Sequence, residues 1–440
     1  MRVNLDQTEL CSNIRLGNFY KVYGKIEQIV AMTVEASGIE CNIGDVCRMF
    51  SGGQNKTEVL AEVVGFRDNK VLLMPYSDTD GIGYGSFVEN TREKLTINVS
   101  EDMVGRAIDA IGNPIDGKGP ISQGARYSIN GVRSNPLDRP PIAQPIELGV
   151  KAIDGMMTIG KGQRMGIFAG SGVGKSTLMG MIARNIKADV NVIALVGERG
   201  REVMEFMNRD LGPEGLKRSV LVVATSDQPA MMRSKCCLTA TTIAEYFKDM
   251  GKDVLLMMDS LTRFCMAERE IGLSIGEPPV ARGYTPSIYA SLPKLLERCG
   301  NFRTGSITGL FTVLVEGDDS NEPVSDTVRG IIDGHIMLSR KIAMKNHYPA
   351  IDVTASLSRL MSEIASPEQK RAASKIRRIM SLYQENADLI SIGAYKSGTN
   401  PELDDAIKKM KAIDEFLQQP VSQKVDFQDT VQIMTQMFEE

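Results

Sequence analysis

The sequence predicts an α/β fold with three successive domains: a small antiparallel β-barrel, a mostly parallel α/β domain and a helical domain. Residues 1–95 contain short alternating segments separated by Gly, Asn or Asp. Residues 146–364 alternate continuous apolar segments with amphipathic ones, the pattern of a parallel sheet covered by helices. Residues 365–440 place apolar side chains at helical spacing. A segment rich in Gly and Pro, 96–145, connects the first two domains.

The N-terminal domain shows four stretches with strand-like alternation, at 20–34, 45–50, 58–66 and 70–75. Their short lengths and the turn residues between them are typical of a small barrel. No cluster of chemically reactive side chains stands out in this region. We therefore expect it to serve in assembly.

The α/β domain begins with a glycine-rich loop between a strand and a helix. An apolar strand at 165–168 precedes Ala169-Gly-Ser-Gly-Val-Gly-Lys-Ser176, and a helical run at 178–188 follows. The glycines allow the backbone to turn tightly and to aim several N–H groups inward. These amides and the helix N-terminus predict a phosphate-binding site. The expected ligands of the phosphates are Gly170, Ser171, Gly172, Val173 and Gly174.

Two side chains at the end of this loop would act on the charge of a bound nucleotide and its metal ion. Lys175 would neutralise the β- and γ-phosphates of a nucleotide, and the Ser176 hydroxyl would ligate Mg²⁺. The usual pattern has glycine where this chain has Ala169; because Gly170 follows directly, we interpret Ala169 as a tolerated small residue. The alternative, an ordinary glycine-rich turn, is disfavoured by the Gly-Lys-Ser-Thr ending.

Carboxylates follow two further predicted strands. The apolar run 254–258 ends in Asp259, at the edge where open α/β sheets place their ligand-binding residues. Asp259 would hold Mg²⁺, most simply through its water shell; the alternative is an N-cap for the next helix. The strand at 190–196 is followed by Glu198 and Glu202, and either could polarise an attacking water. The spacing leaves both open, together with a merely solvated run of charges.

Composition excludes several other classes of protein. Hydrophobic content of 42% and charged content of 24% are ordinary for a soluble globular chain. The net charge, 51 − 55 = −4, gives no basic field for nucleic acid. Two histidines and seven scattered cysteines, none in Cys-x-x-Cys spacing, indicate neither a zinc site nor a disulfide framework. We find no signal peptide and no apolar run near 18 residues, and expect a cytoplasmic protein that reaches a membrane only through partners.

The C-terminal domain carries clear helix-start signals. Ser366-Pro-Glu-Gln369 predicts an N-cap, a proline at the first position and a capping-box glutamine. Asn400-Pro401 predicts a second helix, and Asp426 a third that ends at Glu440. Residues 366–380 carry five bases and one acid, whereas 401–440 carry four bases and nine acids. This polarity fits either a partner-binding surface or a solvated face.

Several long motifs occur in one fixed order along the chain. They are Gly105-Arg-Ala-Ile-Asp-Ala-Ile-Gly-Asn-Pro-Ile-Asp-Gly, the phosphate loop, Gly197-Glu-Arg-Gly-Arg-Glu-Val, Met258-Asp-Ser-Leu-Thr-Arg, Pro286-Ser-Ile-Tyr-Ala-Ser-Leu-Pro-Lys, Asp333-Gly-His-Ile-Met-Leu-Ser-Arg and His347-Tyr-Pro-Ala-Ile-Asp-Val. With these motifs the sequence resembles the catalytic subunits of rotary-type ATPases and, within that group, the type III export ATPases. The resemblance covers nearly the whole chain and implies a RecA-like P-loop core, ATP as substrate and Mg²⁺ as cofactor.

The resemblance also assigns individual residues. It makes Glu198 the water-orienting carboxylate, Arg199 a neighbour of the phosphates and Thr177 a nucleotide contact. Ser356-Leu-Ser-Arg359 matches the segment that presents an arginine finger to the next subunit's nucleotide. The remaining assignments concern the base: Tyr348 matches the adenine-stacking position, and Tyr395 is either a second aromatic wall or a core tyrosine.

Since Glu198 and Arg359 stand in one chain, identical copies could complete every interface site, and the resemblance implies a homohexamer. The segments 167–176, 326–335 and 392–407 resemble the flagellar export ATPases, whereas 224–230 and 315–323 occur in flagellar and injectisome styles alike. The resemblance further implies a stator-like regulator at residues near 1–20. The helical domain would meet a stalk protein, the export gate and substrate–chaperone complexes, and the ring would lie at the inner face of the membrane.

Overall fold

The computed structural model describes residues 21–51, 57–132, 135–315 and 322–438. The chain forms two compact units, the first ending at Leu95 and the second beginning at Thr96. The segment near 1–20, expected to meet a stator-like regulator, lies outside the described residues. No helix in the described ranges combines the length and apolarity needed to cross a membrane.

The first unit is a closed antiparallel barrel with strand order β1-β2-β5-β4-β3-β6. Its inward side chains form a separate apolar core that includes Val34, Met49 and Leu73. The predicted barrel is confirmed; β6 is the strand that the sequence pattern did not single out. Its six strands are β1 Tyr23–Val30, β2 Thr33–Ser37, β3 Asp45–Phe50, β4 Glu58–Arg67, β5 Lys70–Pro75 and β6 Phe87–Lys94.

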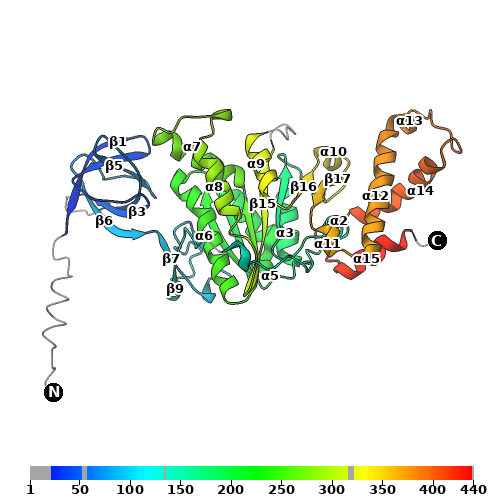
Figure 1. Ribbon diagram of the computed structural model, residues 1–440, viewed down its shortest axis with the longest axis horizontal. Helices are drawn as coiled ribbons and strands as arrows, with labels where there is room; N and C mark the ends of the chain where they lie inside the picture. Colours follow the sequence, from blue (N-terminus) through cyan, green and yellow to red (C-terminus); the bar gives the residue numbers. More distant parts are fainter. Residues whose placement is uncertain (1–20, 52–56, 133–134, 316–321, 439–440) are drawn as a thin grey trace, which may run out of the picture. The chain divides into compact units, whose positions relative to one another are not determined.

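The second unit is built on a nine-stranded sheet (Figure 1). Its main path is β17-β16-β10-β15-β13-β11-β12-β8, and the short strand β14 pairs with β15. All neighbours on the path are parallel except β16 and β17. The strands are β8 Ala107–Asp109, β10 Arg164–Ala169, β11 Val190–Glu198, β12 Ser219–Thr225, β13 Asp253–Asp259, β14 Gly300–Phe302, β15 Gly305–Leu314, β16 Gly334–Leu338 and β17 Ile351–Ser358.

The Gly- and Pro-rich segment 96–145 does more than connect two domains. It forms a small antiparallel ribbon from β7 (Thr96–Val99) and β9 (Ala125–Ser128), and β8 joins the edge of the large sheet beside β12. The short run Ala-Ile-Asp was hidden among turn residues in the sequence. An isolated three-residue run becomes a strand here because β12 offers it an open edge to pair with.

Helices cover the sheet of the second unit. Helix α6 packs on β11, β12, β13 and β15, and α7 packs on α6. The helix α3 starts directly at the glycine-rich loop, after β10. The helices of this region are α2 Lys151–Met156, α3 Lys175–Asn185, α4 Gly200–Glu205, α5 Gly212–Leu216, α6 Ala230–Asp249, α7 Leu261–Ser274, α8 Pro286–Leu296, α9 Pro323–Ile331, α10 Arg340–Met344 and α11 Met361–Ile364; a π-helical segment, Phe206–Leu211, lies between α4 and α5.

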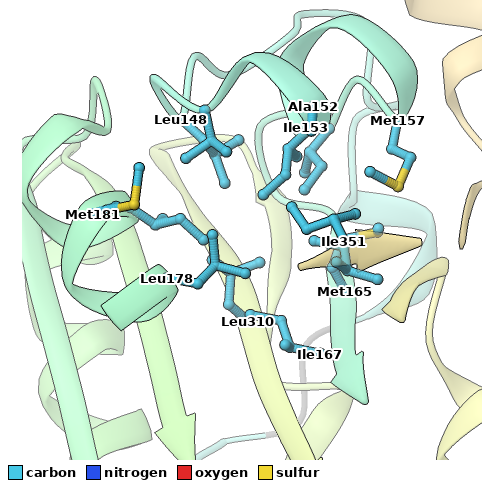
Figure 2. Close-up of a cluster of buried hydrophobic side chains, with 14 of the residues drawn as sticks. Leu148, Ala152, Ile153, Met157, Met165, Ile167, Leu178, Met181, Leu310 and Ile351 are labelled. Atoms are coloured by element: carbon cyan, nitrogen blue, oxygen red, sulfur yellow. The ribbon is translucent and has the colours of Figure 1, made fainter. Parts of the chain in front are cut away.

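The core beneath α2 and α3 fixes the position of the glycine-rich loop. In Figure 2, Leu178 and Met181 of α3 lie in one cluster with Ile167 of β10, Leu310 of β15 and Ile153 of α2. All five side chains are almost completely buried. Burial of each such side chain contributes about 1.5–3 kcal/mol, so the strand before the loop and the helix after it are both held firmly.

The C-terminal helices are α12 Pro367–Glu385, α13 Ala387–Ser391, α14 Pro401–Leu417 and α15 Phe427–Gln436. The predicted caps at Ser366 and Asn400 are confirmed, since their side chains accept backbone N–H groups of α12 and α14. The capping-box role of Gln369 is wrong. Its side chain is 1% exposed and donates instead to the carbonyls of Asp154 and Gly155 and to the Thr158 hydroxyl. A buried amide binds unsatisfied carbonyls across the domain in preference to a solvated cap.

Candidate active site

The phosphate loop has the backbone conformation that its glycines suggested. Gly172 and Gly174 adopt positive φ angles of 77° and 88°, and Gly174 is the N-cap of α3. An L-residue with a side chain would be strained at both positions. Ala169 is the last residue of β10 and pairs with Leu314 and Leu338 on either side. Extended backbone suits alanine, which explains why glycine is not needed there.

Lys175 lies between two carboxylates at the carboxyl edge of the sheet. Its Nζ forms a short ion pair with Asp259 Oδ1 and lies 3.6 Å from Glu198 Oε1. Burial lowers the pKa of Lys175, but the charges of Asp259 and Glu198 outweigh it, and the pKa ends above its usual value. The three side chains come from α3, β11 and β13, so the sheet order brings together residues far apart in the chain.

Asp259 is oriented by the strand beside it. Its carboxyl is 5% exposed and Oδ1 also accepts a 2.7 Å hydrogen bond from the hydroxyl of Thr312 on β15. The next residue, Ser260, is the N-cap of α7, and its Oγ accepts the Arg263 N–H. The alternative reading of Asp259 as the cap is therefore wrong, and its carboxylate faces the phosphate loop.

Glu198 and Glu202 form a carboxyl pair. Glu198 ends β11, and Glu202 follows on the first turn of α4. Burial, the nearby Asp259 carboxylate and the hydrogen bond with Glu202 raise the pKa of Glu198 to about 7 against the opposing effect of Lys175. The pKa of Glu202 falls because of its hydrogen bond with Glu198. The two pKa values therefore move in opposite directions, and the raised one belongs to Glu198, the more buried carboxyl.

A cavity of about 70 Å³ opens between these side chains. It is lined by Ser176, Leu195, Glu198, Glu202, Val203, Glu205, Phe206, Arg209, Asp210 and Asp259. The oxygen ligands fit Mg²⁺, a hard cation that keeps several waters and binds one or two carboxylates, a hydroxyl and the phosphates. No group of three or more His, Cys, Asp or Glu side chains within the described ranges forms an all-protein metal cage. Ser176 and Asp259 would hold the ion here.

Tyr348 lies directly beside the phosphate loop. A Cβ placed on Gly174 would be 3.5 Å from the Tyr348 ring, so the aromatic ring covers the N-terminus of α3. Tyr348 is 41% exposed. The adenine-stacking role of Tyr348 stays a prediction. Its ring and the helix N-terminus together offer an aromatic surface next to a phosphate site.

Tyr395 lies in the helical domain, between α13 and α14. Its hydroxyl forms 3.0 Å hydrogen bonds with the carbonyl of Asn400 and with Asp404 Oδ1. The ring is partly buried against the large core. Both predictions for Tyr395, aromatic wall and core tyrosine, stay predictions, and the contacts favour the second. The segment that touches Tyr348 is instead the one after α14, since the Gln419 N–H donates to the Tyr348 carbonyl at 3.0 Å.

The two predicted arginines are both exposed. Arg199 is the residue before α4; its side chain is 76% exposed and lies 3.6 Å from Glu202. Arg359 directly follows β17 and donates its backbone N–H to Asp333. Its side chain is exposed and has no ion pair with any residue in the described ranges. A guanidinium held on a firm strand end and pointing at solvent is available to a neighbouring molecule.

Sequence reasoning missed two contributors to this site. Thr312, described above, lay within a predicted strand and carried no motif signal. The side chain of Arg263 packs against Gly197, where a Cβ would lie 3.2 Å from it, and its buried Nε has no hydrogen-bond partner in the described ranges. Arg263 ends the quoted Met-Asp-Ser-Leu-Thr-Arg motif. The available signal was a cation in the same conspicuous motif as Asp259.

Models of three families match consecutive parts of the chain. The ATP synthase alpha/beta family β-barrel domain matches residues 26–92, and the nucleotide-binding domain of the same family matches 149–358. The T3SS EscN ATPase C-terminal domain matches 365–436. These ranges correspond to the barrel, the α/β domain and the helical domain.

Individual proteins show the same relationship. The chain is 51% identical to a flagellum-specific ATP synthase of Bacillus subtilis, over 96% of this chain and 97% of that protein. It is 47% identical to a type 3 secretion system ATPase of Xanthomonas euvesicatoria, over 94% and 93% respectively.

Among solved structures, the assembled ATPase EscN from the type III secretion system of enteropathogenic E. coli matches with a TM-score of 0.89 at 44% identity, covering 94% of this chain and 99% of EscN. EscN in complex with its central stalk EscO matches with a TM-score of 0.87 at 43% identity, covering 94% and 99%. The RecA-like core, the barrel and the helical domain therefore confirm the predicted fold class, and the chain belongs to the ATP synthase alpha/beta family, as an ATPase with the C-terminal domain of the type III secretion enzymes.

Proposed function

We propose that this ATPase hydrolyses MgATP as a homohexameric ring and that hydrolysis serves flagellar type III protein export. The observation on which this depends is the arrangement of Lys175, Glu198 and Asp259 around the phosphate loop, with Arg359 exposed on the same chain. The phosphate loop of one protomer binds the triphosphate. Arg359, the cation that completes the site, comes from the next protomer.

The residues of one chain perform most of the chemistry. The backbone amides of the loop and Lys175 bind the phosphates, and Lys175 exchanges its carboxylate partners for phosphate oxygens when nucleotide enters. Glu198, once deprotonated, orients the attacking water and accepts its proton as the bond to the γ-phosphate breaks. Arg263, whose side chain packs against Gly197 directly before Glu198 in the chain, adds a cation to this region.

Magnesium would be held by Ser176 and Asp259. When bound it would supply positive charge that neutralises the phosphates. Thr312 keeps the Asp259 carboxylate directed into the cavity through its 2.7 Å hydrogen bond. The fixed carboxylate therefore does not need to reorganise when the metal–nucleotide complex arrives.

A ring of identical chains is the simplest assembly that uses Arg359. A guanidinium supplied in trans stabilises the charge that spreads over the transferring phosphoryl group. Assembled EscN, at 44% identity, supports self-association of this chain. Because every copy carries both Glu198 and Arg359, all six interfaces of a homohexamer would be catalytic.

The flagellar assignment has the support of the flagellum-specific relative at 51% identity, against 47% for the secretion-system relative. In this role, the ring would release substrates from chaperones and unfold them at the export gate. It would lie in the cytoplasm, at the inner face of the membrane, through partners at its two ends. The stalk complex of EscN supports a stalk partner for this chain.

The test is Glu198→Gln in the full chain, with Glu214→Gln on the exposed surface of α5 as the matched control. We expect Glu198→Gln to bind ATP with near wild-type affinity and to lose turnover by roughly a hundredfold or more. Turnover near the wild-type rate would show that Glu198 is not the base.

Export in cells tests the biological role. We expect Glu198→Gln cells to export flagellar subunits poorly and to swim poorly, while Glu214→Gln cells behave as wild type. Undiminished export by a hydrolysis-dead ring would favour a nucleotide-binding scaffold instead. Loss of virulence-type secretion with normal motility would favour the injectisome.

A further inference from the structure

Gln419, the residue after the C-cap of α14, connects three separate parts of the second unit. α14 ends at Leu417, its C-cap is Gln418, and Gln419 follows. Unlike its exposed neighbours Gln418 and Pro420, Gln419 is only 3% exposed. A glutamine buried in a linker requires partners for its amide, because an unsatisfied buried amide is costly.

The Gln419 side chain is fully engaged. Oε1 accepts the backbone N–H of Lys151 at 2.8 Å, and Nε2 donates to the carbonyls of Gly149 and Gln423, both at 2.8 Å. Lys151 is the first residue of α2, where a helix has N–H groups without internal partners. The amide therefore fixes the linker after α14 onto the entrance of α2.

The backbone of the same residue binds the backbone of the tyrosine beside the phosphate loop. The Gln419 N–H donates to the Tyr348 carbonyl at 3.0 Å, and the Tyr348 ring lies against Gly174 at the phosphate loop. A second contact anchors the linker near this place: Arg184 of α3 donates to the Val421 carbonyl at 2.9 Å. Tyr348 itself is 41% exposed.

We propose that Gln419 is a positioning residue that holds Tyr348 at the distance and angle needed to stack on the nucleotide base. This inference rests on the proposed ATP hydrolysis and on the predicted stacking of Tyr348 on the base. Gln419 acts only through Tyr348 and does not touch the phosphates. Its loss should therefore weaken ligands that carry a base and spare ligands that consist of phosphates alone.

The experiment compares Gln419→Ala with Gln418→Ala in the full chain. Steady-state ATP hydrolysis gives kcat and KM, and competitive inhibition by MgADP and by magnesium tripolyphosphate gives two inhibition constants. For Gln419→Ala we expect KM for ATP and the inhibition constant for ADP to rise about tenfold together, with kcat within about twofold. The inhibition constant for tripolyphosphate should stay at the wild-type value.

The neighbouring glutamine is the matched control, because its exposed side chain makes no hydrogen bond in the described ranges and all constants should be unchanged in Gln418→Ala. Equal weakening of ADP and tripolyphosphate by Gln419→Ala would overturn the proposal, since it would indicate a general disturbance of the phosphate loop. Unchanged constants would overturn it as well.

Two further measurements distinguish a failure of this proposal from a failure of the proposed ATP hydrolysis. Calorimetric titration with MgADP needs no turnover, so it reads the Gln419 effect even if the chain fails to hydrolyse ATP. Tyr348→Ala should produce the same selective loss, and Gln419→Ala added to Tyr348→Ala should have no additional effect on ADP. Additive effects of the two substitutions would show that Gln419 acts by another route.

Discussion

Lys175, the first residue of α3, and Arg359, directly after β17, are both cations, yet their surroundings are opposite. The Lys175 side chain is 13% exposed and has two carboxylate partners. The Arg359 side chain is exposed and has no ion pair in the described ranges. In the absence of nucleotide the first charge is balanced within its own chain, whereas the second is not.

This difference separates the two halves of a shared site. A buried cation with internal partners belongs to a centre that one chain completes, because leaving it unpaired would be very costly. An exposed cation on a firm strand end costs nothing to leave unpaired and can serve another molecule. Substitution of each residue therefore tests whether the site is divided between protomers in this way.

The largest effect is expected from Lys175→Ala. It removes the phosphate-binding charge and leaves Asp259 and Glu198 without their common counter-ion, so kcat/KM should fall roughly ten-thousandfold. Lys217→Ala, which removes an exposed lysine paired with Glu214, is the control. Hydrolysis assays give kcat/KM for both variants, and ATP titrations give their affinities. Retention of normal ATP affinity by Lys175→Ala would contradict the assignment of the loop.

Arg359→Ala should lower kcat by about a thousandfold, because a trans arginine acts on the transition state. ATP affinity should change little. Mixing Arg359→Ala chains with Lys175→Ala chains should restore part of the activity, since some interfaces then combine an intact loop with an intact arginine. Absence of rescue at every mixing ratio would place Arg359 outside a shared site.

A smaller effect concerns pH. Glu198, with a pKa of about 7, is protonated below neutrality and cannot act as base there. The kcat/KM of the wild type should therefore fall about tenfold per pH unit below pH 7 and level off above it. Glu202→Gln removes one cause of the raised pKa, so the acid limb should move to lower pH. A limb at the same pH in both proteins would show that another group, such as ATP itself, determines it.

The smallest effect concerns a carboxyl outside the catalytic chemistry. Asp154 is completely buried and accepts backbone N–H groups of Leu148 and Gly149; burial raises its pKa to about 7. Because the folded-state pKa lies above the unfolded value, the stabilising contribution is full at acid pH and is lost as pH rises through 7.

The melting temperature should accordingly fall between pH 6 and pH 8, and the fall should be smaller by about 2–4 °C in Asp154→Asn. The quantity to compare is the slope of the melting temperature against pH. The melting temperature itself is no measure of the effect, because Asp154→Asn also loses one backbone hydrogen bond at every pH. Asp405→Asn, at an exposed position on α14, should keep the wild-type slope. An unchanged slope in Asp154→Asn would mean that Asp154 stays ionised in the folded protein.

Local patterns in the sequence were sufficient for the elements that present the site. The strand ending at Asp259, the strand ending at Glu198 and the glycine loop before α3 all appear at or within a few residues of their predicted bounds. Each depends on short-range physics: apolar runs form buried strands, and glycines permit positive φ. The helix caps at Ser366 and Asn400 have the same local origin.

The partners of buried polar groups could not be read from the sequence. Gln369 has the spacing of a capping box, yet its amide binds residues more than two hundred positions away. The edge strand β8 was equally unpredictable, because only the open side of β12 makes three residues into a strand. Such choices depend on which unsatisfied groups the fold brings within reach.

The sequence by itself determined the order of domains, the phosphate loop and the identity of the acids and bases available. The tertiary structure decided that the pKa of Glu198 is raised and that of Glu202 lowered, since Glu198 is more deeply buried and close to Asp259, whereas Glu202 has its hydrogen bond with Glu198 and is close to Arg199 and Arg201. It also decided that Gln419, unremarkable in the sequence, contacts the tyrosine beside the phosphate loop. Burial and pairing arise between residues distant in the chain, such as Lys175 and Asp259, 84 positions apart, and no local pattern encodes them.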